Sequence, residues 1–298
     1  MTNKTFYHYC SIDSFFKIIE SKSIWLSNSS VMNDFEENTR IEKHFSMIDS
    51  LFENENHIEL KNWIKPFYEL FKPDYSLIFC LSEEKDQLSQ WRGYANDGTG
   101  VSIGFNVNKL GIDKKINPKL DFFSTIIKKI NITDSSIFNK TNEIMVFKKL
   151  IYDETLQKNF IEEFFEKIKN EYDKNPFDKD LIIPFCGFFL SITSNVFKNP
   201  CFDEEKEWRI IHSSKKSSNL KTELKKEIAN LSELKYRVTN NKITSYKILN
   251  LSDFFNSTLI PEIILGPKCN IDEKILNDFL ISNNLEKTNI IKSQSSYR

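Results

Sequence analysis

Paired cysteines and long apolar runs are both missing from this chain of 298 residues. Its five cysteines are scattered along the sequence: Cys10, Cys80, Cys186, Cys201 and Cys269. The absence of a C-x-x-C pair argues against a disulfide framework or a zinc motif and predicts a reducing compartment. No run approaches the roughly 18 apolar residues of a membrane span, and the N-terminus lacks the apolar region of a signal peptide. We therefore expect a cytoplasmic protein without a membrane partner.

An excess of charge is absent too, because 41 basic residues stand against 42 acidic ones. A balanced chain creates no global field for nucleic acid or a membrane, although a local basic groove is compatible with these numbers. The composition, 40% hydrophobic and 28% charged, is typical of a soluble globular protein with ample material for a core.

Several motifs that carry known chemistry are also missing. The sequence contains no G-x-G-x-x-G fingerprint after a strand, no P-loop, no H-E-x-x-H and no G-x-S-x-G. Hydride and metal chemistry therefore lack support. A nuclease is disfavoured as well, because no clustered Asp, Glu and His set for a metal is visible, and we expect no metal.

Glycine is scarce, with only seven in the chain, yet four of them fall within residues 88–105. They are Gly93, Gly98, Gly100 and Gly104. Ordering a glycine costs backbone entropy. A chain with so few glycines is therefore expected to have them where φ is positive or where two backbone segments approach closely. The pattern around it predicts a strand, a short helix, a glycine turn and a second strand, which together could frame an aromatic-walled pocket.

Hydrophobic periodicity predicts a single α+β domain over residues 1–298. Strands are expected at 5–10, 23–27, 75–81, 101–105, 208–212, 245–251, 259–265 and 289–292. Helices are expected after Ser11, after Asn33-Asp34, and around 58–72, 142–172, 185–196, 219–233 and 272–283, with irregular structure at 107–140. The central helices form an insertion at about 142–198 between early and late strands.

Glu205 and Glu207 are the first candidate catalytic residues. On a strand, residues two apart face one side, and two carboxylates there repel each other, which raises one pKa. That arrangement suits acid–base work or stabilisation of an oxocarbenium ion. The alternative is an acidic strand edge entering the sheet. Arg209 shares their face and could hold one of them ionised.

Four further residues are candidates for binding a ligand. His8 lies mid-strand, on the face opposite Tyr7, where its imidazole could donate to a ribose hydroxyl or simply be a satisfied core residue. Trp91 and Tyr94 are three apart on a helix and could stack on a planar ring or pack in the core. Arg92 points elsewhere and could hold a phosphate or a carboxylate.

Short motifs spread over nearly the whole chain resemble a large uncharacterised bacterial domain family of unknown function. They are Tyr7-His8-Tyr9 with Ser11, Trp25-Leu26-Ser27, Asn33-Asp34-x-Glu36, Ser89-Gln90-Trp91 to Tyr94, Gly98-x-Gly100-Val101-x-Ile103-Gly104-Phe105, Glu205-x-Glu207-Trp208-Arg209, Ile263-Ile264-Leu265-Gly266-Pro267, and Ser293 with Tyr297-Arg298. Members of this family are often found among phage-defence and abortive-infection genes, which is what the resemblance implies here.

A second resemblance concerns mechanism. A His on the first strand, an aromatic-bearing strand and helix, and a Glu on a late strand resemble the order in ADP-ribosyltransferases of the His-Tyr-Glu type. The resemblance implies that His8 holds a ribose hydroxyl, Tyr94 stacks on nicotinamide, and Glu207 binds the ribose and steadies the transition state. Glu205 would be the extra carboxylate that some transferases use. A Ser-Thr-Ser strand is lacking, and the helical insertion has no obvious counterpart there.

The leading hypothesis is therefore an NAD-consuming toxic effector of bacterial antiphage defence, of ADP-ribosyltransferase-like fold. It would cleave the nicotinamide–ribose bond of NAD and pass ADP-ribose to a protein, a nucleic acid or water, without a metal and with other defence proteins as possible partners. The alternative is a non-catalytic module that binds a nucleotide, a nucleic acid or a phage protein in the same pocket.

Overall fold

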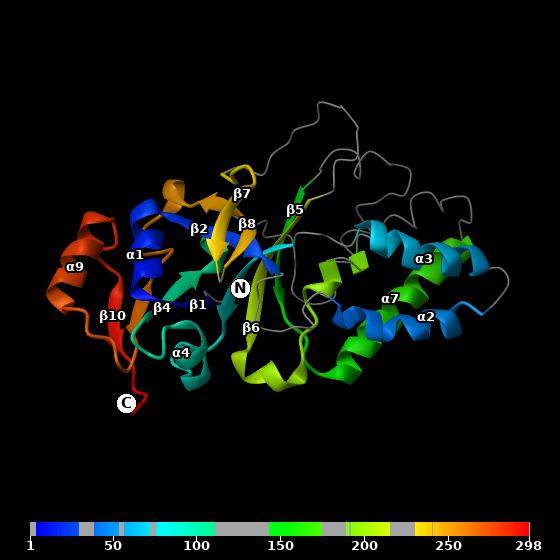
Figure 1. The fold of residues 1–298 in the computed structure, drawn as a ribbon, viewed down its shortest axis with the longest axis horizontal. Coiled ribbons are helices and arrows are strands. Elements are labelled where there is room, and N and C mark those ends of the chain that lie inside the picture. The colour runs from blue at the N-terminus through cyan, green and yellow to red at the C-terminus, as the bar shows by residue number, and fades with distance from the viewer. Residues whose placement is uncertain are drawn as a thin grey trace.

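The computed structural model describes residues 4–29, 39–53, 57–71, 76–110, 143–174, 189–190, 192–214, 230–239 and 241–297. It shows a mixed α/β protein built on a mostly antiparallel open sheet, in agreement with the expected combination of helices and a mixed or antiparallel sheet (Figure 1). The strands are β1 (Thr5–Cys10), β2 (Ser23–Asn28), β3 (Leu77–Ser82), β4 (Val101–Asn106), β5 (Glu143–Lys149), β6 (Glu207–Ser214), β7 (Lys235–Thr239), β8 (Lys242–Asn250), β9 (Glu262–Leu265) and β10 (Asn289–Lys292).

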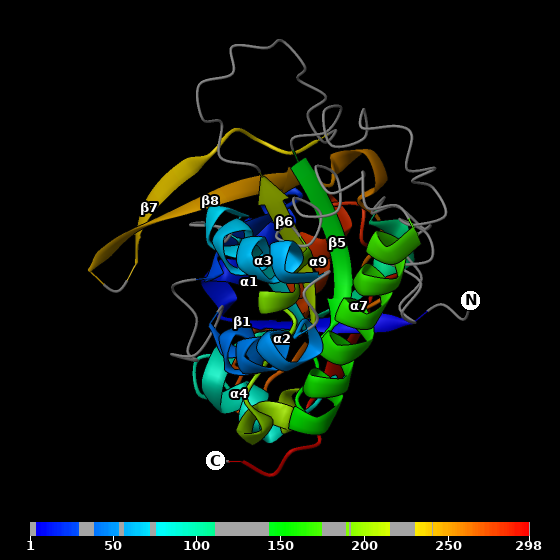
Figure 2. The same cartoon turned by 90° about the vertical axis from the view of Figure 1, so that its right-hand side faces the viewer.

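The described helices include α-helices and short 3-10 helices. The α-helices are α1 (Ile12–Ser21), α2 (Phe45–Leu51), α3 (Ile58–Phe71), α4 (Leu88–Tyr94), α7 (Glu154–Lys174) and α9 (Glu273–Ser282). Short 3-10 helices are η2 (Arg40–His44), η4 (Val107–Lys109), η6 (Pro200–Glu205) and η7 (Ser252–Phe254). Figure 1 shows α2, α3 and α7 gathered beside the sheet, away from α1 and α9, and Figure 2 shows this group of three helices from its own side. Among the described residues, no helix has the length and apolarity that crossing a bilayer requires.

The sheet runs in the order β10-β9-β4-β1-β3-β2-β8-β7, and β6 with β5 branches from β3. Strand β3 therefore has three neighbours. It pairs with β6 along its whole length, with β2 at Leu77 and Ile78, and with β1 through the single pair Tyr7 and Ser82. Strands β1 and β2 approach the same edge of β3 from its two ends, and neither pairs with its centre near Cys80. The sheet is split there.

The two faces of the sheet are covered differently. Helices α1 and α9 cover one face and bury Phe15, Ile19, Leu276 and Leu280 in the largest core cluster. The opposite face carries two smaller apolar clusters: α4 packs Trp91 on Tyr7, Tyr9 and Ile264, and residues 192–196 pack on Ile78, Val146 and Ile211. The space between these two clusters contains the pocket described below.

The predicted helical insertion begins with a strand instead of a helix. Residues 143–149 form strand β5, paired along β6, and the helix starts only at Glu154. Apolar spacing fits a helix in this stretch, but Phe147 stacks on Trp208 across the strand pair, with ring centroids 4.9 Å apart. Pairing with the open edge of β6 overrides the local period.

Other predictions fall wholly or mostly outside the described residues. These are Asn33-Asp34-x-Glu36, most of the irregular stretch at 107–140, most of the helix at 219–233, and Arg298. The helix expected at 185–196 is described in part, and residues 189–190 and 192–194 are helical there. The helix expected to follow Asn33-Asp34 is interrupted where it is described, because η2 gives way to α2 at Phe45.

The glycine segment packs backbone against backbone at the ends of strands β1, β4 and β9. A Cβ atom on Gly100 would lie 2.1 Å from the carbonyl oxygen of Cys10, and one on Gly266 would lie 2.4 Å from that of Gly98. The Gly266 N–H donates to the Gly100 carbonyl at 3.0 Å. Gly100 and Gly266 thus allow two backbone segments to approach closely. Gly93, in contrast, lines the pocket described below.

We predict that Gly100→Ala destabilises the protein by at least about 2 kcal/mol, because backbone atoms must move to admit the methyl group. Gly93→Ala is the matched control. A Cβ there meets nothing within 4 Å, and the position is helical, so stability should rise or stay within about 1 kcal/mol. Urea denaturation measures both, and equal losses in the two variants would contradict this account of the turn.

Candidate functional site

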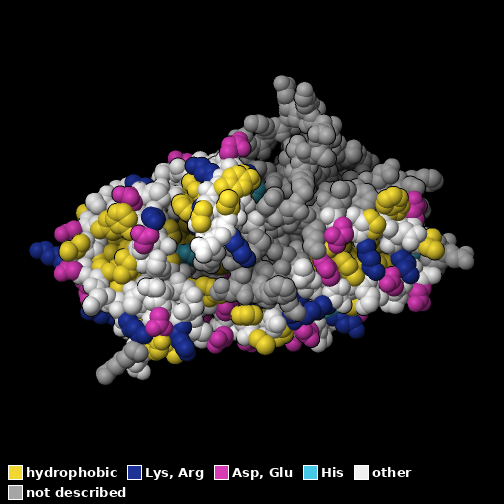
Figure 3. All heavy atoms as spheres, viewed as in Figure 1, with side chains coloured by type: hydrophobic (Ala, Val, Ile, Leu, Met, Phe, Trp, Pro, Cys, Tyr) yellow, Lys and Arg dark blue, Asp and Glu magenta, His cyan; other side chains and the backbone are white. Residues whose placement is uncertain are grey.

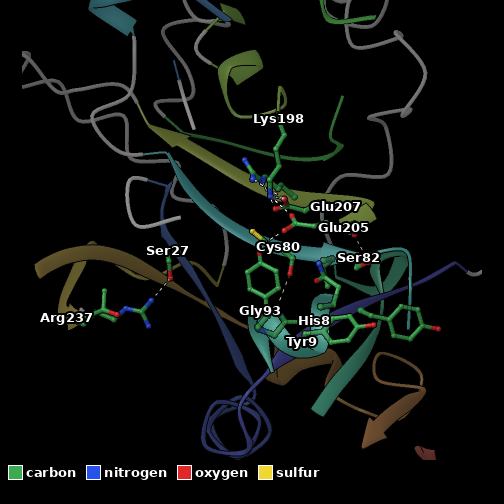
Figure 4. A pocket seen from close by; sticks show the side chains of 16 residues that line it. His8, Tyr9, Ser27, Cys80, Ser82, Gly93, Lys198, Glu205, Glu207 and Arg237 are labelled. Atoms are coloured by element: carbon green, nitrogen blue, oxygen red, sulfur yellow. Dashed lines mark hydrogen bonds and ion pairs between the residues drawn. The ribbon is translucent and has the colours of Figure 1, made fainter. Parts of the chain in front are cut away.

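A pocket of about 350 Å³ opens on the sheet face between α4 and the segment that precedes η6. Its lining comprises Tyr7, His8, Tyr9, Ser27, Cys80, Leu81, Ser82, Gln90, Gly93, Tyr94, Lys198, Glu205, Glu207, Arg209, Arg237 and Thr239 (Figure 4). Five of the seven candidate residues are therefore brought to one place from positions almost 200 residues apart: His8, Tyr94, Glu205, Glu207 and Arg209.

Strand register explains the convergence. Ser82 pairs with both Tyr7 and Glu207, and Cys80 pairs with Arg209, so these side chains share one face of the sheet. Ser27 pairs with Ile78, which extends the same face onto β2. The split beside the centre of β3 leaves room between the two parts of the sheet.

His8 reaches the pocket through this split. Its register places it on the face opposite Tyr7, as the sequence predicted, where its ring stacks on Phe79 with centroids 4.3 Å apart. Its Nδ1 lies 2.9 Å from the carbonyl oxygen of Cys80. A carbonyl only accepts, so Nδ1 carries the proton and Nε2 is the acceptor of the neutral ring. Burial outweighs this hydrogen bond and lowers the His8 pKa to about 4, so the imidazole is neutral near pH 7.

A buried cluster of four charged side chains forms the floor of the pocket. The Nζ of Lys198 contacts Oε2 of Glu205 and donates to Oε2 of Glu207 at 2.7 Å. Arg209 grips Glu207 with Nε at 2.7 Å and Nη2 at 3.1 Å, and its Nη1 donates to the carbonyl of Asn195. Figure 4 shows Lys198 reaching down between the two carboxylates.

Local structure brings Lys198 to these carboxylates. Asn199 caps η6, Pro200 starts it, and Lys206 ends it in the left-handed region with φ of 42°. This short 3-10 helix brings Glu205 back beside Lys198 before β6 begins at Glu207. The Ser82 hydroxyl donates to the Glu205 carbonyl and fixes the turn to β3.

The electrostatics of Glu207 differ from the prediction. Burial alone would raise its pKa, but Arg209 and Lys198 outweigh burial and lower the pKa to about 2. The expected mutual repulsion of Glu205 and Glu207 is wrong for this residue, because Lys198 lies between the carboxylates and attracts both. Glu205 is also the last residue of η6, and only Lys206 separates it from the strand on which the two glutamates were expected to share a face.

Tyr94 ends α4 at the rim of the pocket with 37% of its surface exposed. Its hydroxyl donates to Oε1 of Glu205 at 2.7 Å. Burial of the hydroxyl, together with the charge of Glu205, raises the pKa of Tyr94 far above neutrality. The phenol therefore stays protonated and supplies a ring face and one donor.

Trp91 and Arg92 lie outside the pocket, in contrast to the ligand-binding roles proposed for them. The Trp91 ring is 0% exposed, packs edge-on against Tyr9 and donates from Nε1 to Asp86 at 2.7 Å. Arg92 is exposed, with its guanidinium 5.9 Å from the ring centroid of Tyr297. Helical spacing put Trp91 and Tyr94 on one face, but Gln90, Gly93 and Tyr94 are the residues of α4 that line the pocket, while Trp91 packs against β1.

Two residues that line the pocket, Lys198 and Arg237, were not predicted from the sequence. Lys198 precedes Asn199-Pro200 with no pattern to mark it among 41 basic residues. Arg237 did carry a signal, because Lys235, Arg237 and Thr239 alternate along a strand and give it one polar face.

Comparison with known families covers part of the chain. Residues 90–210 match the model of a family described as a protein of unknown function (DUF2971). The match confirms the expected domain of unknown function over this range, which includes Tyr94, Lys198, Glu205, Glu207 and Arg209. His8 and Arg237 lie outside it. No curated protein and no solved structure matches the chain. Within the described residues, no three His, Cys, Asp or Glu side chains gather as a metal site would require.

We predict that Glu207→Gln costs about 3–5 kcal/mol at pH 7, because it leaves Arg209 and Lys198 buried without a shared counter-charge. The folded-state pKa of Glu207 is depressed, so its stabilisation is present above about pH 4.5 and is lost as the pH falls towards 2. The gap between variant and wild type should therefore narrow over that window in urea titrations.

Exposed Glu204, three residues earlier, provides the matched control. Glu204→Gln should change stability by less than about 0.5 kcal/mol at every pH. A pH-independent cost for Glu207→Gln would show that shape rather than charge matters at this position.

Proposed function

We propose that the protein is an NAD-consuming enzyme of ADP-ribosyltransferase-like architecture that cleaves the nicotinamide–ribose bond. The observation that carries the proposal is the convergence of His8, Tyr94 and two carboxylates on one pocket. These are the residue types, in the chain order, on which the resemblance to His-Tyr-Glu transferases rests. The pocket volume of about 350 Å³ falls within the range of small-molecule sites.

The proposed roles follow from the state of each side chain. Neutral His8 offers Nε2 as an acceptor to a ribose hydroxyl. The exposed ring of Tyr94 offers a face to the nicotinamide ring. As the C–N bond breaks, its electron pair leaves with nicotinamide and positive charge develops on the ribose. A fixed carboxylate beside that charge stabilises the transition state more than the ground state.

The pairing pattern favours Glu205 over Glu207 as the carboxylate that meets the ribose. Both oxygens of Glu207 accept from Arg209, and Lys198 adds a third bond. Among the described residues, Oε1 of Glu205 accepts only from the hydroxyl of half-exposed Tyr94, which a substrate hydroxyl can replace. Glu207 then acts as a positioning residue that holds Lys198 and Arg209. A water or an acceptor group adds to the ribose from the pocket side and gives up its proton to Glu205 or solvent.

The biological setting in this proposal comes from the resemblance to defence genes. NAD consumption depletes a central metabolite, or ADP-ribose transfer inactivates a protein or nucleic acid, and either outcome is toxic in an antiphage response. Charged side chains of both signs are interspersed over the face in Figure 3, so the pocket rather than an extended basic surface is the feature to test.

One observation favours the alternative of a non-catalytic binding module. All four charges of the cluster are paired with one another, as expected of a rigid floor that shapes a binding site. In that case the pocket binds a nucleotide, a nucleic-acid end or a phage protein without turning it over.

Release of nicotinamide from NAD, followed by chromatography, separates these two proposals. We expect turnover by the wild type, a loss of at least about tenfold in kcat/KM for Tyr94→Ala, and a change within about threefold for Tyr94→Phe, which keeps the ring. Both substitutions lie at a half-exposed rim, so their melting temperatures should stay near that of the wild type. Equal activity of Tyr94→Ala and wild type would contradict the proposed stacking of the Tyr94 ring on nicotinamide.

Glu205→Gln tests the carboxylate directly. We expect kcat to fall about 10²–10³-fold, as for loss of a preorganised group at a charged transition state. Circular dichroism and the melting temperature check that the variant folds, and Glu204→Gln serves as the neighbouring control for activity as it does for stability. A folded Glu205→Gln protein with full nicotinamide release would contradict the proposed role, and absence of release from wild type would promote the binding module.

A further inference from the structure

The far side of the pocket carries a charged residue to which the proposed chemistry gives no role. Arg237 of β7 lines the pocket together with Thr239 on the same strand and Ser27 of β2. Figure 4 shows Arg237 and Ser27 apart from the cluster formed by Lys198 and the two glutamates. The pocket therefore has two chemically different ends.

Aromatic rings hold the Arg237 guanidinium in place. Its central carbon lies 5.1 Å from the ring centroid of Trp25 and 5.6 Å from that of Tyr246, and these two rings stack on each other. Register puts them on the same sheet face as Arg237, because Tyr246 pairs with both Ser27 and Lys235. The Nη2 atom donates to the Ser27 hydroxyl at 2.9 Å. The fork is thus fixed before any ligand arrives.

This arginine has unused binding capacity. Its Nε is buried and has no hydrogen-bond acceptor, and within the described residues Arg237 forms no ion pair. A partly buried cation without a counter-ion is costly, and burial accordingly lowers the pKa of Arg237. Arg209, by contrast, has its carboxylate in Glu207. An anion is the group that Arg237 lacks.

Charge balance over the lining supports the same conclusion. Lys198 and Arg209 offset Glu205 and Glu207, so Arg237 leaves the pocket lining with one excess positive charge. A guanidinium fork matches two oxygens of a phosphate, and the hydroxyls of Ser27 and Thr239 are suitable neighbouring donors. Trp25 and Tyr246 shield the site from water and strengthen the interaction.

We infer that Arg237, with Ser27 and Thr239, forms a phosphate-binding subsite, so that the pocket takes a ligand with a phosphate group at this end and an uncharged or cationic group at the carboxylate end. The phosphate subsite depends on the surroundings of Arg237 alone. Its assignment to the diphosphate of NAD rests on the proposed function.

Calorimetric titration tests the subsite without any need for turnover. The probes are ADP-ribose and inorganic pyrophosphate, with adenosine as a phosphate-free comparison. We expect both phosphate probes to bind wild type, Arg237→Met to raise their Kd at least about tenfold, and Arg237→Lys, which keeps the charge but loses the fork, to raise it less. Lys235→Met removes one positive charge from an exposed position on the same strand and should leave Kd unchanged.

The outcomes separate this inference from the proposed function. Dependence of ADP-ribose and pyrophosphate binding on Arg237 supports the subsite even if NAD is never cleaved. Nicotinamide release with an unchanged KM in Arg237→Met and Arg237→Lys would uphold the function and overturn the subsite. Equal affinity of wild type and both Arg237 variants for the phosphate probes, or no binding of either probe by wild type at millimolar concentration, overturns it as well. A melting temperature near that of wild type for either Arg237 variant makes the comparison valid.

Discussion

The pocket depends on one ammonium group, the Nζ of Lys198, which lies between two buried carboxylates. Without it, Glu205 and Glu207 would repel each other in a low dielectric, and one of them would have to take up a proton. Burial by itself lowers the pKa of Lys198, but the charges of Glu207 and Glu205 together outweigh this and raise it, so the lysine stays a cation. Such a cluster adds little net stability compared with apolar packing, but it strongly disfavours other arrangements of the turn at η6.

The second constraint is the split beside β3. Three strands compete for the edges of β3, and the centre of one edge is left to the His8 side chain, which binds the Cys80 carbonyl where a strand would otherwise pair. A sheet without this split would be continuous and would have no room for a ligand. The same split separates the wall formed by β1 and α4 from the wall formed by β2, β7 and β8. The proposed catalytic side chains and the proposed phosphate subsite thus belong to different parts of one sheet.

Much of the fold could be predicted from periodicity and caps, and the failures share one cause. Ser11 caps α1 as expected, and β9, α9 and β10 lie within a few residues of their predicted positions. Residues 143–149 were misassigned as helix because a partner strand 60 residues away decides their conformation. The glutamate pKa was misjudged for the same reason, since Lys198 lies next to the carboxylates only after η6 has formed. Sequence periodicity predicts local helices and strands. The charge balance in a pocket depends on tertiary contacts between distant residues, which periodicity does not predict.

The site residues fall into two physical groups, and this division indicates where function should be sought. Glu207 and Arg209 satisfy each other almost completely and owe their positions to the fold. Within the part of the chain that the structure describes, Nε2 of His8 has no hydrogen-bond donor and the buried Nε of Arg237 has no acceptor, while Tyr94 exposes its ring. Folding normally pairs buried polar groups, so unused capacity that gathers in one pocket is more informative about a ligand than the strongest ion pair in it. The paired cluster holds the pocket in shape, and the binding capacity left on His8, Tyr94 and Arg237 indicates what the pocket can bind.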